Sequence, residues 1–155
     1  MHAIGILKQT RTLIDGFVAG TSEYHLVAIP EGFRNNILWN LGHVVVTQQL
    51  LHYRLSGQDP RVADELVEGF RNGTSPADWT EMPDVAELRR LAVELPERLD
   101  EDVRAGRLSK FSSYTTSKGV VLTTLEDAIS FNNVHEGMHL GIMMSLRNVL
   151  SPRAL

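Results

Sequence analysis

Hydrophobic residues recur at steps of three and four along four stretches of the chain, which is the spacing of amphipathic helices. We expect helices over about residues 2–18, 33–55, 84–105 and 123–150. No repeat or domain boundary separates these stretches, so the pattern predicts a single domain over residues 1–155. Helices of this number and length predict an all-α fold, and specifically a four-helix bundle.

Capping signals mark the start of the last two predicted helices. Asp84 with Glu87, and Thr123 with Glu126, have the spacing of capping boxes. Pro96 lies inside the third helix, where it lacks an amide hydrogen and crowds the preceding turn. We therefore expect a kink or a break at this proline.

The second predicted helix, residues 33–55, is apolar on two faces. One face carries Ile37, Leu41, Val44, Leu51 and Leu55, and the other carries Trp39, His43, Val46 and Leu50. A helix that is apolar on two faces is buried on two sides. We expect one face inside the bundle and the other against a partner subunit. Leu140 and Met144 form a further apolar stripe on the last helix, which also favours a homodimer.

Two connections are rich in turn-forming residues. Residues 58–83 form a long connection between the second and third helices, with a weakly helical patch at 62–70. Connections of this length usually cross the bundle or shape a site, and a crossover breaks the simple up-down order of helices. Residues 107–121 are polar and predict a loop or a short hairpin.

Composition excludes several classes of protein. The formal charge is −4 and the 15 Lys and Arg residues are scattered, so a nucleic-acid partner is not expected. No window approaches the ~20 apolar residues that cross a membrane. Lys8, Arg11 and Asp15 interrupt the first apolar stretch, which argues against a signal peptide. We expect a mature, cytoplasmic protein.

The chain contains no cysteine. This excludes disulfides, cysteine-bound zinc, iron–sulfur clusters and a cysteine nucleophile. A chain of 155 residues can bury about two-thirds of its unfolded surface in one core, so it needs no metal merely to fold. Any metal is therefore expected to be functional.

His135 and His139 are four residues apart on the last predicted helix, which places them about 6 Å apart on one face. We expect that face to be the one turned to the core, because Ala128, Ile142 and Val149 share it. A buried imidazole needs partners for both nitrogens, and one divalent cation would satisfy a nitrogen of each ring. The alternative is a pair of core histidines held by backbone carbonyls.

The segment 135–139 reads HEGMH and matches the H-E-x-x-H pattern of zinc peptidases, in which Glu136 would be the general base. That mechanism needs a third ligand downstream. The sixteen residues after His139 include no His, Asp or Glu, which disfavours a peptidase. We expect Glu136 either to support the ligands or to lie at the surface.

A third ligand must then come from another helix. His43 is the best candidate, because Trp39, Val46 and Leu50 flank it on a face predicted to be buried. His52 lies nearly opposite on the same helix and is expected at or near the surface.

Three further side chains are candidates for the pocket around the histidines. Asn36 lies two turns before His43, and Asn132 lies one turn before His135, so either amide could orient a ligand. Trp39 could line the pocket. The alternatives are amides at the helix surface and an ordinary core aromatic.

These motifs together resemble the DinB-like (YfiT-like) superfamily. The resemblance rests on NNILWNLGH at residues 35–43, on HEGMHLG at 135–141, and on the order and spacing of helices along the whole chain. It implies an up-down-down-up four-helix bundle with metal ligands at His43, His135 and His139. Zinc and nickel are the expected metals, with iron and manganese left open. The family offers no fixed catalytic acid or base to transfer, so the catalytic residues stay unknown.

Characterised relatives in that superfamily include transferases and isomerases that use bacillithiol, mycothiol or glutathione, and dimers are common among them. Three neutral histidines leave a coordination position open, which can hold water or a thiolate. Because the chain lacks cysteine, a sulfur nucleophile must come from a low-molecular-weight thiol.

We therefore expect a metal-dependent thiol S-transferase that acts on a small-molecule substrate in detoxification or stress. Two alternatives stay open. One is a hydrolase that uses metal-bound water, and the other is a non-catalytic, metal-stabilised bundle that acts through a partner.

Overall fold

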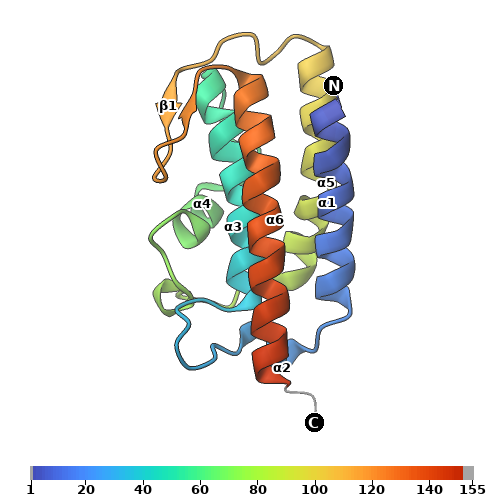
Figure 1. The fold of residues 1–155 in the computed structure, drawn as a ribbon, viewed down its shortest axis with the longest axis vertical. Coiled ribbons are helices and arrows are strands. Elements are labelled where there is room, and N and C mark those ends of the chain that lie inside the picture. Colours follow the sequence, from blue (N-terminus) through green and yellow to red (C-terminus); the bar gives the residue numbers. More distant parts are fainter. Residues whose placement is uncertain (1, 152–155) are drawn as a thin grey trace.

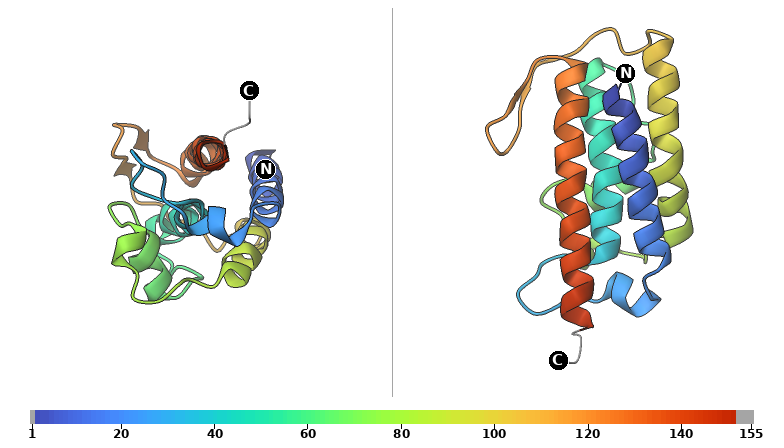
Figure 2. Two further views of the ribbon diagram at one scale, coloured as in Figure 1. Left: turned by 90° about the horizontal axis from the view of Figure 1, so that it is seen from below. Right: turned by 45° about the vertical axis from the view of Figure 1, so that its right-hand side comes forward.

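Four long helices lie side by side in the computed structural model, which describes residues 2–151 (Figure 1). They are α1 (His2–Ala19), α3 (Ile37–His52), α5 (Val85–Arg104) and α6 (Leu125–Leu150). Helices α1 and α3 each pack against both α5 and α6. The chain runs in one direction along α1 and α6 and in the opposite direction along α3 and α5 (Figure 2). The expected all-α class is confirmed.

Short elements connect the long helices. These are α2 (Glu23–Val27), α4 (Asp64–Phe70), the 3-10 turns η1 (Arg54–Ser56) and η2 (Pro76–Asp78), and strands β1 (Tyr114–Thr115) and β2 (Val121–Leu122). The strands pair antiparallel, with Tyr114 opposite Leu122. Of the two alternatives for residues 107–121, the structure therefore contains the hairpin. Within residues 2–151, no helix has the length and apolar character needed to cross a membrane.

Helix α3 is buried on nearly every side. Its inner face joins the main apolar core, to which Ile14, Val44, Leu88 and Met143 contribute from the four long helices. Its outer face is covered by α4, and a side chain at Gly42 would collide with the Phe70 ring. The expectation that this face meets a partner subunit is wrong, because the chain's own long connection already covers it.

Two helix starts differ in detail from the expected capping boxes. Asp84 caps α5, accepting from the amides of Ala86 and Glu87 at 2.8 and 3.2 Å, but the Glu87 side chain does not return the bond that a capping box requires. The residue that caps α6 is Thr124, one residue later than predicted, and the box is formed by Thr124 and Asp127. The Asp127 carboxylate accepts from the backbone amides of both Thr123 and Thr124, which the predicted partner Glu126 does not do. This tighter arrangement fixes the start of α6.

Helix α5 continues through Pro96 without the break that proline suggested. Proline cannot donate to the carbonyl of Ala92, one turn earlier. That carbonyl instead accepts from Nη1 of Arg11 at 3.2 Å. A side chain from α1 thus replaces the missing backbone hydrogen bond, and the helix stays intact.

Arg11 also forms an ion pair with Glu136 in the middle of the four helices. Both side chains are fully buried, and their two hydrogen bonds measure 2.7 and 2.8 Å. Arg11 donates to the carbonyl of Val44 on α3 at 2.7 Å, and Asn132 donates to Glu136 at 2.6 Å. This network, which we call the Arg11–Glu136 network, contacts all four long helices. Glu136 is therefore not at the surface, and its carboxylate accepts from Arg11 and Asn132 rather than supporting a histidine of the predicted site.

Replacing Glu136 by leucine should destabilise the protein strongly, because it leaves the Arg11 guanidinium buried without a counter-charge. We expect a loss of about 3–5 kcal/mol in the free energy of unfolding, measured by urea denaturation. The double variant Arg11→Met/Glu136→Leu removes both charges and should recover much of that loss. Equal stability of the Glu136→Leu single variant and the wild-type protein would contradict this assignment.

His52 is fully buried at the end of α3, whereas the sequence pattern indicated a position at or near the surface. Burial lowers the pKa of His52 to about 3. The folded protein therefore excludes the proton that the unfolded chain takes up near pH 6.5. Stability contributed by the neutral ring is present above pH 6.5 and is lost as the pH falls towards 3.

His52→Leu should make the protein less sensitive to acid. Between about pH 6 and 4, the free energy of unfolding of the wild-type protein should fall more steeply, by up to about 1.4 kcal/mol per pH unit. Urea denaturation of both proteins at several pH values measures this difference. Parallel pH profiles would show that His52 does not titrate on unfolding.

Candidate metal centre

His43, His135 and His139 meet between α3 and α6. One ring nitrogen from each histidine can be chosen so that the three atoms lie within 4.8 Å of one another. The His135 and His139 ring centroids are 4.5 Å apart, and His43 lies 5.1 and 4.7 Å from them. The structure thus brings together the three histidines that the sequence singled out, one from α3 and two from α6.

The ring of His43 is fixed from its far side. Its Nδ1 lies 2.7 Å from the carbonyl oxygen of Phe70, the last residue of α4. A carbonyl only accepts hydrogen bonds, so Nδ1 carries the proton and Nε2 keeps its lone pair. The long connection therefore shapes the site, as its length suggested.

The ring of His139 is fixed in the same way by Asn40. Nδ1 of His139 donates to Oδ1 of Asn40 at 2.7 Å. The Asn40 amide is oriented because its Nδ2 donates to the carbonyl of Asn36 at 2.7 Å. This leaves Nε2 of His139 as the nitrogen with a lone pair. Groups that hold the second nitrogen of a metal-binding histidine in this way set its tautomer and its direction.

Asn40 did not stand out in the sequence, although an amide inside the apolar run ILWNLGH was a usable signal. Asn36, for which a role in orienting a ligand and a place at a helix end were both left open, caps α3. Its Oδ1 accepts from the amide of Trp39 at 2.7 Å, and only its backbone carbonyl supports Asn40.

His135 has the least support of the three. Its Nδ1 is buried and has no hydrogen-bond partner among residues 2–151. An unpaired buried nitrogen of this kind costs about 1–3 kcal/mol unless something else binds it. A cation that bound His135 would not have to displace a hydrogen bond from its Nδ1, because none is present within the part of the chain that the structure describes.

The two α6 histidines do not lie on the face of the helix that enters the core. Ala128 is buried as expected, together with Asn132, Glu136 and Met143, but Ile142 and Val149 are 40% and 53% exposed. The face of α6 that enters the core is therefore rotated by a fraction of a turn from the face that the sequence pattern predicted. His135 and His139 lie on the flank of α6 that faces α3, half-buried rather than in the centre of the protein.

Burial favours the neutral form of all three imidazoles. Burial, with a contribution from the neighbouring histidines, lowers the pKa of His135 to about 3 and that of His139 to about 4. Burial also lowers the pKa of His43. Neutral imidazoles are good ligands for zinc, nickel and other divalent transition metals. The donors present therefore fit such an ion, and three protein ligands leave a position open for a further molecule.

The other predicted pocket residues have different roles. Trp39 stacks on His43, with ring centroids 4.5 Å apart, and its Nε1 donates to Thr74. It therefore does line the histidine cluster. Asn132 and Glu136 face away from the cluster into the Arg11–Glu136 network. A carboxylate held by Arg11 cannot serve as the general base of the H-E-x-x-H pattern, so the peptidase hypothesis is not supported.

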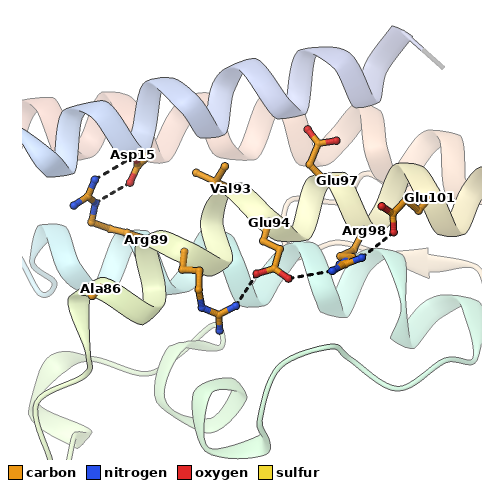
Figure 3. A pocket seen from close by; sticks show the side chains of 9 residues that line it. Asp15, Ala86, Arg89, Val93, Glu94, Glu97, Arg98 and Glu101 are labelled. Carbon is orange, nitrogen blue, oxygen red and sulfur yellow. Dashed lines mark hydrogen bonds and ion pairs between the residues drawn. The ribbon is translucent and has the colours of Figure 1, made fainter.

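A large groove lies elsewhere, on the outer side of α5 beside Asp15 of α1 (Figure 3). It has a volume of about 690 Å³, and none of the three histidines lines it. Its charged side chains pair with one another, as in Arg90–Glu94 and Arg98–Glu101. We interpret this groove as an ordinary solvated helix face.

The arrangement defines a class: an all-α protein with a three-histidine cluster between two of its long helices. A sequence model described as the DinB superfamily matches residues 6–143, a range that includes all three histidines. The chain therefore belongs to the DinB superfamily, and the resemblance of its motifs to that family is confirmed. No curated protein matches the chain.

Asn40→Ala should weaken metal binding by removing the group that orients His139. Loss of such a supporting hydrogen bond typically lowers metal affinity by about 10–100-fold. Competition with a chromophoric chelator for Zn²⁺ measures the affinity. Asn40→Asp keeps an oxygen that accepts from His139 and should bind Zn²⁺ more tightly than Asn40→Ala. Equal affinities of Asn40→Ala and the wild-type protein would refute the supporting role.

Proposed function

We propose that this DinB superfamily protein binds one divalent metal ion through His43, His135 and His139, and that it transfers a low-molecular-weight thiol to a small electrophilic substrate. Zinc or nickel is the favoured ion. One observation carries the proposal: three neutral imidazoles converge, and two of them have Nδ1 held so that Nε2 faces the cluster. A role in detoxification or stress would follow from this chemistry.

The thiol part of the proposal rests on composition and coordination together. Three protein ligands leave room for an external molecule, and the chain has no sulfhydryl of its own. A bound divalent metal stabilises a thiolate or hydroxide at neutral pH. His43 and His139 would hold their lone pairs towards the ion, while Trp39 would cover one side of the His43 ring.

The arrangement of helices supports the family's expected topology. We interpret α1, α3, α5 and α6 as an up-down-down-up four-helix bundle in which residues 58–83 form the crossing connection. The contacts of α1 and α3 with both α5 and α6 support this interpretation. Of the stripe expected to favour a homodimer, Met144 is 47% exposed and supports that further proposal, whereas Leu140 is partly buried against the chain's own core.

Elemental analysis of purified protein tests the metal site. We expect about one metal ion per chain in the wild-type protein, because a three-histidine site binds a single ion. His43→Ala and His139→Ala should lose the metal. His2→Ala, at an exposed position at the start of α1, serves as the matched control and should retain it. Unchanged metal content in both cluster variants would refute the site.

Turnover assays test the reaction. The metal-loaded protein is incubated with an electrophile and with bacillithiol, mycothiol or glutathione, and thiol consumption is followed. We expect turnover that requires both metal and thiol. Hydrolysis without added thiol would indicate the hydrolase alternative. Metal binding without any turnover would favour a non-catalytic bundle.

A further inference from the structure

Thr47 lies beside the nitrogen of His43 that faces the cluster. It follows His43 by one turn on α3, and its Oγ1 lies 3.4 Å from Nε2 of His43. Because Nδ1 of His43 is engaged with Phe70, Nε2 is the nitrogen that would bind a metal. The Thr47 hydroxyl is therefore on the side of the His43 ring that faces the proposed ion, and not on the side held by Phe70.

The Thr47 hydroxyl has a side-chain partner in place of a backbone carbonyl. A helical serine or threonine commonly donates to the carbonyl one turn earlier. Thr12 in α1 and Ser145 in α6 do so, at 3.0 and 2.9 Å. The Thr47 hydroxyl instead has Nε2 of His43 as its partner. At 3.4 Å this hydrogen bond is long and weak, so a better acceptor could readily displace the ring nitrogen.

The other donors around the cluster are already used. Nε1 of Trp39 donates to Thr74, and Nδ2 of Asn40 donates to Asn36. Thr47 is half-buried, so it is accessible both to the cluster and to a molecule that enters from solvent. Among the side chains described at this site, Thr47 is thus the hydroxyl best placed to contact an incoming ligand.

We propose that Thr47 positions the external ligand of the metal site by donating a hydrogen bond to its anionic sulfur, oxygen or nitrogen atom. This inference deepens the proposed function and rests on it. A thiol would bind as the thiolate, releasing its proton to solvent. A donor that stabilises the charged form lowers the pKa of the bound thiol and increases its affinity.

Cobalt-loaded protein provides a test that does not depend on turnover. The visible absorption of bound Co²⁺ reports both metal loading and the binding of a further ligand. The probes are 2-mercaptoethanol and azide, each titrated at fixed pH. Thr47→Val replaces the hydroxyl by a methyl group of similar size, and Thr47→Ser keeps the hydroxyl as the matched control.

We expect Thr47→Val to bind both probes about tenfold more weakly than the wild-type protein, as for the loss of one hydrogen bond to a charged group. Its affinity for Co²⁺ and its thermal unfolding should change little, since no metal ligand is removed. Thr47→Ser should bind both probes nearly as well as the wild-type protein.

Two results would overturn the assignment: unchanged probe affinity in Thr47→Val, or equal weakening in Thr47→Ser and Thr47→Val. If wild-type protein binds azide but not 2-mercaptoethanol, the thiol proposal fails, while the azide titrations still decide the role of Thr47. If wild-type protein binds no Co²⁺, both the metal site and the Thr47 assignment are rejected.

Discussion

The buried ion pair between Arg11 and Glu136 is the constraint on which the arrangement of helices depends. Two charges removed from water are tolerated only when their hydrogen-bonding groups find partners, and here α3 and α5 supply carbonyls and α6 supplies Asn132. Glu136 must therefore point into the protein. Because Glu136 lies between the two α6 histidines in sequence, its inward direction turns both of them towards α3, where His43 lies.

The same arginine links two features that would otherwise be separate weaknesses. Pro96 leaves the Ala92 carbonyl without its helical donor, and Arg11 has more donors than Glu136 alone can accept. The spare donor of Arg11 and the unpaired carbonyl of Ala92 therefore satisfy each other. The long connection has a similar double role, because Phe70 packs over Gly42 while its carbonyl orients His43. Segments that stabilise the fold thus also set the direction of a candidate ligand.

Periodicity and spacing were enough to predict the four long helices and the pair His135 and His139, because these signals are local or repeat regularly along the chain. The choice of His43 rested more on the likeness to the DinB-like superfamily. The orientation of α6 was not predictable in the same way. Its apolar residues suggested a core face with Ile142 and Val149, whereas the actual core face carries Glu136, whose partner is 125 residues away in sequence. Asn40 was missed for the same reason, since its contact with His139 exists only after folding.

The position of the histidines on two different helices has a mechanical consequence. A cation bound to His43 and His135 would join residues 92 positions apart and so cross-link α3 to α6. Unlike a disulfide, which persists in the unfolded chain, such an ion would be released on unfolding, so it would stabilise the folded state by binding to it. A chain without cysteine would thus gain a reversible cross-link between α3 and α6. The availability of the ion would govern how readily these two helices separate.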